Sequence, residues 1–114
     1  MSRRSDPPKT PLVIALDLGG SKLAAALVTR SGQVRNCVSE ATELSSRQAC
    51  LEQLMAAARR ARARAQGRAG AVGISVPGLV RRDGTVWAPN LPGWARVPVA
   101  RPIRSALGLP VVVE

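Results

Sequence analysis

The sequence predicts an α/β domain built on a mixed five-stranded β-sheet, and three observations lead to this fold class. Near the N-terminus, three short runs rich in branched apolar residues follow one another with only short glycine-containing turns between them. A long segment rich in alanine and arginine then has the spacing of a helix with one apolar face. Two further apolar runs follow, one directly after the helix and one at residues 109–114. Strands joined by tight turns are antiparallel and strands joined through a helix are parallel, so the sheet should be mixed.

The first three strands are expected at residues 12–17, 22–29 and 34–39. Gly19 and Gly20 suit a tight turn between the first pair, and the Ser-Gly-Gln sequence at 31–33 suits a second turn. The third run is more polar than the other two, so it should lie nearer an edge of the sheet. These strands together form an antiparallel three-strand meander.

The helix is expected to begin near Ser45, which forms a capping-box pattern with Gln48, and to stop near Gly67. One face of it carries the apolar residues Leu51, Leu54, Met55, Ala58, Ala61 and Ala65. Arginines take much of the rest, and those in the last turns suit the negative end of the helix dipole. This role favours a solvated basic face over a helix that binds nucleic acid.

The second half of the chain predicts a strand from 69–70 to about Val76 and a hairpin turn at Asp83-Gly84. A short helix is expected at 103–107, opened by Pro98, by Pro102 or later, and ended by Gly108. The run Leu-Pro-Val-Val-Val-Glu at 109–114 predicts a final buried strand. Helices therefore flank the sheet, and 114 residues are enough for one domain.

The net charge is +10, and 15 of the 17 basic residues are arginine. Such a charge fits a nucleic-acid or anionic-surface partner, or a chain in which arginine has replaced lysine on solvated faces. No aromatic residues alternate with the arginines, so a stacking platform for single strands is not expected. A nucleic-acid partner is therefore not expected.

Cys37 and Cys50 are isolated thiols and are expected to be small core residues in a reducing compartment. No apolar run approaches the roughly 20 residues of a membrane helix, and residues 1–11 lack the apolar core of a signal peptide. The expected location is cytoplasmic, with no membrane partner. Residues 1–11 are expected to form a disordered tail ahead of a domain at 12–114.

The stretch at residues 17–22 places Asp17, Gly19, Gly20, Ser21 and Lys22 at the break between two apolar runs. Glycines let backbone N–H groups approach an anion, while serine and lysine add a donor and a positive charge. Aspartate can hold Mg²⁺ directly or through water. Because a carboxylate is costly to bury without a partner, the pattern favours a site for metal-bound phosphate. The alternative is a plain hairpin; a Walker A loop is excluded because the turn runs into a strand.

Four segments in this order resemble the ROK family of bacterial sugar kinases and sugar-responsive repressors: ALDLGGSKLAAALVTRSGQV, AVGISVPGLV, GTVWAPNLPGW and LGLPVVVE. The similarity spans about residues 12–114, nearly the whole chain. The resemblance implies the N-terminal domain of an actin-like, ribonuclease-H-like ATPase fold and an ATP-dependent hexose kinase of the glucokinase type. Its ligands would be Mg-ATP and a sugar, and a homo-oligomer is possible.

By this resemblance, Asp17 would lie near Mg²⁺ and the phosphates, with Gly19, Gly20, Ser21 and Lys22 forming the phosphate-binding turn. Ser21 stands where the family usually has threonine. Gly78, Asn90 and Glu114 would lie at the sugar site, with Asn90 in a sugar-side loop at residues 88–94. Trp87 and Trp94 are expected to be packing anchors more than sugar-stacking rings.

The chain departs from the family pattern at Glu114, where the family continues into Asn-Asp and that aspartate is the general base. The resemblance therefore implies an incomplete domain with no catalytic residue of its own. Two other interpretations stay open: a ROK-type transcriptional regulator without its DNA-binding domain, and a basic nucleic-acid-binding module or nuclease. A nuclease would need several carboxylates near Asp17, and the sequence predicts no such convergence.

Overall fold

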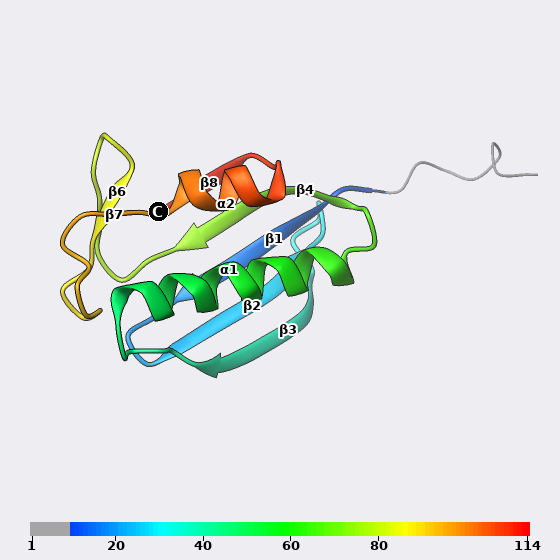
Figure 1. The fold of residues 1–114 in the computed structure, drawn as a ribbon. Helices are drawn as coiled ribbons and strands as arrows, with labels where there is room; N and C mark the ends of the chain where they lie inside the picture. The colour runs from blue at the N-terminus through cyan, green and yellow to red at the C-terminus, as the bar shows by residue number, and fades with distance from the viewer. Residues whose placement is uncertain (1–9) are drawn as a thin grey trace, which may run out of the picture.

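The computed structural model describes residues 10–114, which form a layer of strands with helices packed against it (Figure 1). The predicted disordered tail at 1–11 falls mostly on residues 1–9, which lie outside the described residues. Among residues 10–114, no helix combines the length and apolar character needed to cross a bilayer.

The main sheet has five strands in the order β3-β2-β1-β4-β8. The first three, β1 (Leu12–Leu18), β2 (Lys22–Val28) and β3 (Val34–Ala41), are antiparallel neighbours, which confirms the predicted meander. The strands β4 (Ala69–Ser75) and β8 (Val111–Val113) run parallel to β1. The α/β fold with a mixed sheet is thereby confirmed. The carboxyl ends of the parallel strands β1, β4 and β8 all lie along the same edge of the sheet.

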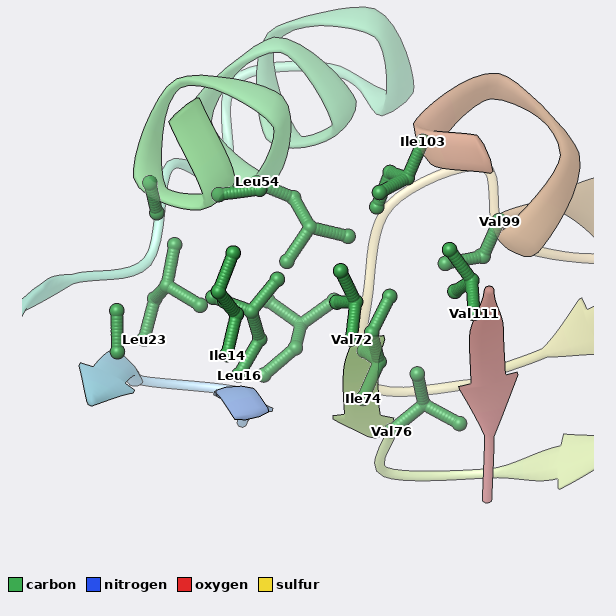
Figure 2. Packing of buried hydrophobic residues seen from close by; sticks show 14 of the residues in the cluster. Ile14, Leu16, Leu23, Leu54, Val72, Ile74, Val76, Val99, Ile103 and Val111 are labelled. Carbon is green, nitrogen blue, oxygen red and sulfur yellow. The ribbon is translucent and has the colours of Figure 1, made fainter. Parts of the chain in front are cut away.

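Both helices, α1 (Arg47–Arg64) and α2 (Ala100–Leu107), cover the same face of this sheet. Figure 2 shows Leu54 of α1 and Ile103 of α2 pointing down onto Ile14, Leu16 and Val72. These side chains are all buried, so the core lies between the helices and one face of the sheet.

The ends of the helices differ from the sequence prediction. The cap of α1 is Ser46, whose Oγ accepts a hydrogen bond of 3.0 Å from the Ala49 N–H, and not Ser45. The helix α2 begins at Ala100, earlier than residue 103. Pro102 is its third residue, where the backbone N–H has no partner within the helix and proline is tolerated. Gly108 ends α2 with φ of 68°, as predicted.

A second, three-stranded sheet lies between β4 and α2 along the chain. The strands β5 (Leu79–Val80) and β6 (Thr85–Trp87) form the hairpin predicted at Asp83-Gly84, and β7 (Val97–Pro98) pairs with β6. Asp83 Oδ1 accepts hydrogen bonds from both the backbone N–H and the hydroxyl of Thr85, at 2.9 and 2.6 Å, and Gly84 adopts φ of 86°. No sequence pattern predicted β7.

The face of the main sheet opposite the helices is open. The prediction that the last strand is buried is wrong for this face, because Val112 is 62% exposed while its neighbour Val111 is buried. Cys37 is also exposed on the edge strand β3, so it is not the core residue that was predicted, whereas Cys50 is fully buried.

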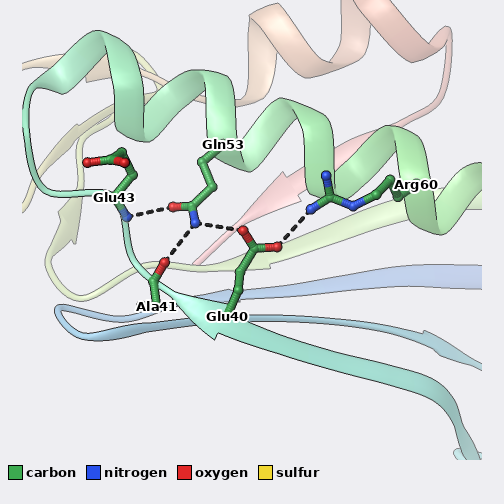
Figure 3. A network of polar contacts seen from close by, with 5 residues as sticks. All are labelled: Glu40, Ala41, Glu43, Gln53 and Arg60. Carbon is green, nitrogen blue, oxygen red and sulfur yellow. Dashed lines mark hydrogen bonds and ion pairs between the residues drawn. The ribbon is translucent and has the colours of Figure 1, made fainter.

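A polar network ties α1 to the end of β3 (Figure 3). Gln53 donates to the carbonyl of Ala41 and to the carboxylate of Glu40, both at 2.8 Å, and its Oε1 accepts from the Glu43 N–H at 2.7 Å. Arg60 forms an ion pair of 2.7 Å with Glu40. The backbone at 41–43 is therefore fixed by α1, directly beside the turn between β1 and β2.

Candidate functional site

The predicted phosphate turn, residues 17–22, connects β1 to β2 at the edge where β1, β4 and β8 end. The Gly19 N–H donates to the Lys22 carbonyl at 2.8 Å, which closes the turn. Ser21 and Lys22 are exposed, so both can reach a ligand in solvent.

Asp17 lies on the open face, because side chains alternate along β1 and those of Leu16 and Leu18 point into the core. It is exposed, so the sequence argument from the cost of burying this carboxylate does not apply. Its partner across the parallel pairing with β4 is Ser75. The chemical argument for a cation-binding oxygen remains, and solvent access favours it.

Glu114 extends the pairing at the same edge: its N–H donates to the carbonyl of Ile74 at 2.8 Å, and its carbonyl accepts from the N–H of Val76 at 2.9 Å. Asp17, Ser75 and Glu114 together line a groove of about 540 Å³ on the open face of the sheet. The structure thus brings Asp17 and Glu114 into one groove, whereas Gly78 and Asn90 do not line it.

The predicted sugar loop, residues 88–94, folds back on itself, since the Ala88 N–H donates to the Trp94 carbonyl at 2.8 Å. Its apolar side chains, Leu91 and Trp94, are buried in the core, while Asn90 is exposed. A methyl group built on Gly20 would lie 3.5 Å from Cβ of Asn90. Asn90 of the sugar loop therefore lies beside Gly20 of the phosphate turn, with room for no more than about one methyl group between them, although the two residues are 70 positions apart in the chain.

Gly78 has a steric role that the sequence did not indicate. A Cβ at this position would lie 1.9 Å from the Trp87 carbonyl oxygen and 2.8 Å from the Ala88 Cα. Only glycine allows the chain leaving β4 to pass this close to the end of β6. Its predicted place beside a sugar stays a prediction.

The two tryptophans differ in environment. Trp94 is 2% exposed and is a packing anchor, as expected, whereas Trp87 is 41% exposed. The indole N–H of Trp94 is, within residues 10–114, the one buried side-chain N or O atom without a hydrogen-bond partner.

Sequence reasoning missed Thr42, the one buried polar residue of the described chain at 8% exposed. Its hydroxyl donates to the Gly19 carbonyl at 2.8 Å, and its backbone N–H donates to the Ser21 carbonyl at 2.9 Å. Nothing in the local pattern after β3 distinguishes this threonine, because both partners lie more than 20 residues away along the chain.

Glu43 lies beside the segment that supports the turn, and a local hydrogen bond perturbs its carboxylate. The pKa of Glu43 lies below its usual value because the Ser45 N–H donates to its carboxylate. No three His, Cys, Asp or Glu side chains gather within residues 10–114 in a way that could hold a metal ion. Any cation at Asp17 would need most of its ligands from a bound molecule or water.

Comparison with known proteins identifies the family. The family model of the ROK family matches residues 13–114, nearly the whole chain. The chain belongs to the ROK family. The glucokinase of Streptomyces coelicolor is 34% identical over 105 residues, which cover 90% of this chain and 32% of that protein. This chain thus spans about a third of the length of the curated relatives it matches.

Solved ROK structures have the same fold. The ROK glucokinase of Streptomyces griseus, in complex with glucose and AMPPNP, is 34% identical with a TM-score of 0.77, over 90% of this chain and 32% of that one. The ROK hexokinase of Thermus thermophilus is 36% identical with a TM-score of 0.79, over 90% and 34%. A ROK transcriptional regulator, a homologue of the E. coli MLC protein, is 23% identical with a TM-score of 0.79 over 90% and 27%, which shows the shared fold alone.

Proposed function

We propose that this chain is the N-terminal, phosphate- and sugar-binding part of an ATP-dependent hexose kinase of the actin-like ATPase fold. The phosphate turn at 17–22 would bind the phosphates of Mg-ATP, and the sugar loop at 88–94 would bind the sugar. The similarity to Streptomyces glucokinases makes a hexose the expected acceptor class.

The closeness of Gly20 and Asn90 carries this proposal. Phosphoryl transfer is mainly a matter of bringing donor and acceptor together and stabilising charge. A phosphate turn and a sugar loop that lie side by side satisfy the first requirement. A plain hairpin would not require a polar loop against its glycines.

The donors at the turn fit a phosphate. The N–H groups of Gly20 and Ser21 donate to no acceptor among the hydrogen bonds of residues 10–114. Lys22 adds a positive charge nearby. These groups would orient the phosphate chain and favour its negative charge.

A single exposed carboxylate fits Mg²⁺, which keeps several waters and takes one or two carboxylates plus phosphate oxygens. Asp17 would hold the ion directly or through water, and Glu114 would lie at the edge of the sugar site. When bound, the ion neutralises charge on the transferring phosphate. Asn90 would orient a sugar hydroxyl by hydrogen bonding, and its amide offers both a donor and an acceptor.

A chimera tests this function, because the chain spans about a third of its curated relatives. Residues 12–114 would replace the matching region of the Streptomyces coelicolor glucokinase. We expect glucose-dependent ADP release with Mg-ATP from the chimera. A chimera that folds, binds neither AMPPNP nor glucose, and releases no ADP would refute the proposal.

A further inference from the structure

Thr42 binds two of the carbonyl groups in the phosphate turn. Its hydroxyl binds the carbonyl of Gly19 at 2.8 Å, and its N–H binds that of Ser21 at 2.9 Å. Thr42 is 8% exposed and this hydrogen bond is partly buried, so water competes for it less than for an exposed bond. Both contacts come from one residue, which fixes the turn at two points against the end of β3.

The position of Thr42 is itself fixed by α1. Gln53 accepts a hydrogen bond from the Glu43 N–H at 2.7 Å and donates to the Ala41 carbonyl at 2.8 Å, so it holds the residues on both sides of Thr42 (Figure 3). A continuous series of hydrogen bonds therefore links α1, the segment 41–43 and the turn.

Two adjacent glycines make such support necessary. Gly19 and Gly20 have more backbone freedom than any other pair, and a free Gly-Gly turn would sample many arrangements of its N–H groups. With the carbonyls of Gly19 and Ser21 bound to Thr42 and the Gly19 N–H bound to Lys22, the N–H groups of Gly20 and Ser21 remain available.

We propose that Thr42 is a positioning residue that holds the turn with the Gly20 and Ser21 N–H groups ready for phosphate oxygens. This inference rests on the proposed function, because it assigns to that turn the binding of phosphate. Thr42 itself touches no ligand. It acts by reducing the entropy that the turn would otherwise lose when a phosphate binds.

The test compares Thr42→Val, which keeps the shape and removes the hydroxyl, with Thr42→Ser, which keeps the hydroxyl. Thr29→Val is the matched control, because the Thr29 hydroxyl accepts from the Gln33 N–H in the turn at the opposite end of β2. Amide hydrogen exchange of Gly19 is measured by NMR on the 114-residue chain and compared with the core amide of Ile14, which reports global opening.

We expect Thr42→Val to speed exchange at Gly19 roughly 5-fold relative to Ile14, as loss of one hydrogen bond implies. Thr42→Ser should restore the parent rate, and Thr29→Val should leave it unchanged. Titration of the matching chimeras with Mg-AMPPNP should then show weaker binding for Thr42→Val, with affinity rescued in Thr42→Ser.

Each result is decisive. Unchanged exchange at Gly19 in Thr42→Val would overturn the role of Thr42, whether or not nucleotide binds. Faster exchange with unchanged Mg-AMPPNP affinity would overturn positioning for phosphate. A parent chimera that binds no Mg-AMPPNP, together with a turn that Thr42→Val loosens in the 114-residue chain, would remove the proposed function and leave a purely structural clamp.

Discussion

Replacing Gly78 with alanine should destabilise the chain severely. The new Cβ would lie 1.9 Å from the Trp87 carbonyl oxygen and 2.8 Å from the Ala88 Cα, and real Cβ contacts do not come below 3.0 Å. Both atoms belong to the backbone, so no flexible side chain can move aside. Ala88 is fully buried and its N–H is bonded to Trp94, so the whole hairpin would have to shift.

The expected cost is about 3 kcal/mol, at the upper end for overpacking of a well-packed site. For a domain of this size, that corresponds to a fall of about 15 °C in melting temperature. It is a large part of the roughly 5–15 kcal/mol that stabilises a typical domain. Circular dichroism melting of the 114-residue chain measures it.

Gly73→Ala is the matched control. Gly73 lies in β4 with no atom within 4 Å of a built Cβ and no positive φ, so alanine there should leave stability unchanged or raise it by about 0.5 kcal/mol. A Gly78→Ala chain that melts within about 2 °C of the parent would refute the steric reasoning. In that case, a raised KM for sugar in the chimera would assign Gly78 to the sugar site instead.

Four further predictions concern the site and the surface. In the chimera, Asp17→Asn should lower turnover by roughly 10²-fold or more without altering the melting temperature, and near-parent turnover across a range of Mg²⁺ would exclude its role. Asn90→Ala should raise KM for the sugar more than for ATP, by an amount equivalent to about 1–3 kcal/mol; a change confined to ATP would contradict it. A thiol reagent at neutral pH should modify the exposed Cys37 quickly and Cys50 only on unfolding. Cys50 is buried, and burial raises the pKa of its thiol. Equal modification rates of the two cysteines would show that the core is open to the reagent. The 114-residue chain should self-associate in light scattering through its exposed apolar strands, and Val112→Lys should reduce this; a monomer at all concentrations would contradict it.

The elements that depend on local chemistry were predictable from sequence. The strand β1, the turn at Gly19-Gly20 and the hairpin at Asp83-Gly84 follow from apolar runs and turn residues within a few positions of one another. The end of α2 at Gly108 follows in the same way from the conformational freedom of glycine.

Features that depend on distant partners were not predictable. Asn36 has φ of 52° beside an irregularity in the pairing of β2 with β3, and no turn residue announces it. The exposure of Asp17 and Val112 depends on which face the helices cover, and an apolar run does not reveal this. The contacts of Gly78 and Thr42 are made with residues that come close only after folding.

The arrangement of strands explains why residues so far apart in sequence could meet. Because β1, β4 and β8 are parallel, Asp17, Ser75 and Glu114 end on one edge of the sheet. The chain also leaves β1 and β4 at that edge, so the phosphate turn and the segment leading to the sugar loop start there. In open α/β sheets, ligands bind beyond the carboxyl ends of the strands, where loops rather than core side chains meet the solvent. Thr42 lies at the same edge because the antiparallel β3 returns to it, which places the support of the turn and the turn itself side by side.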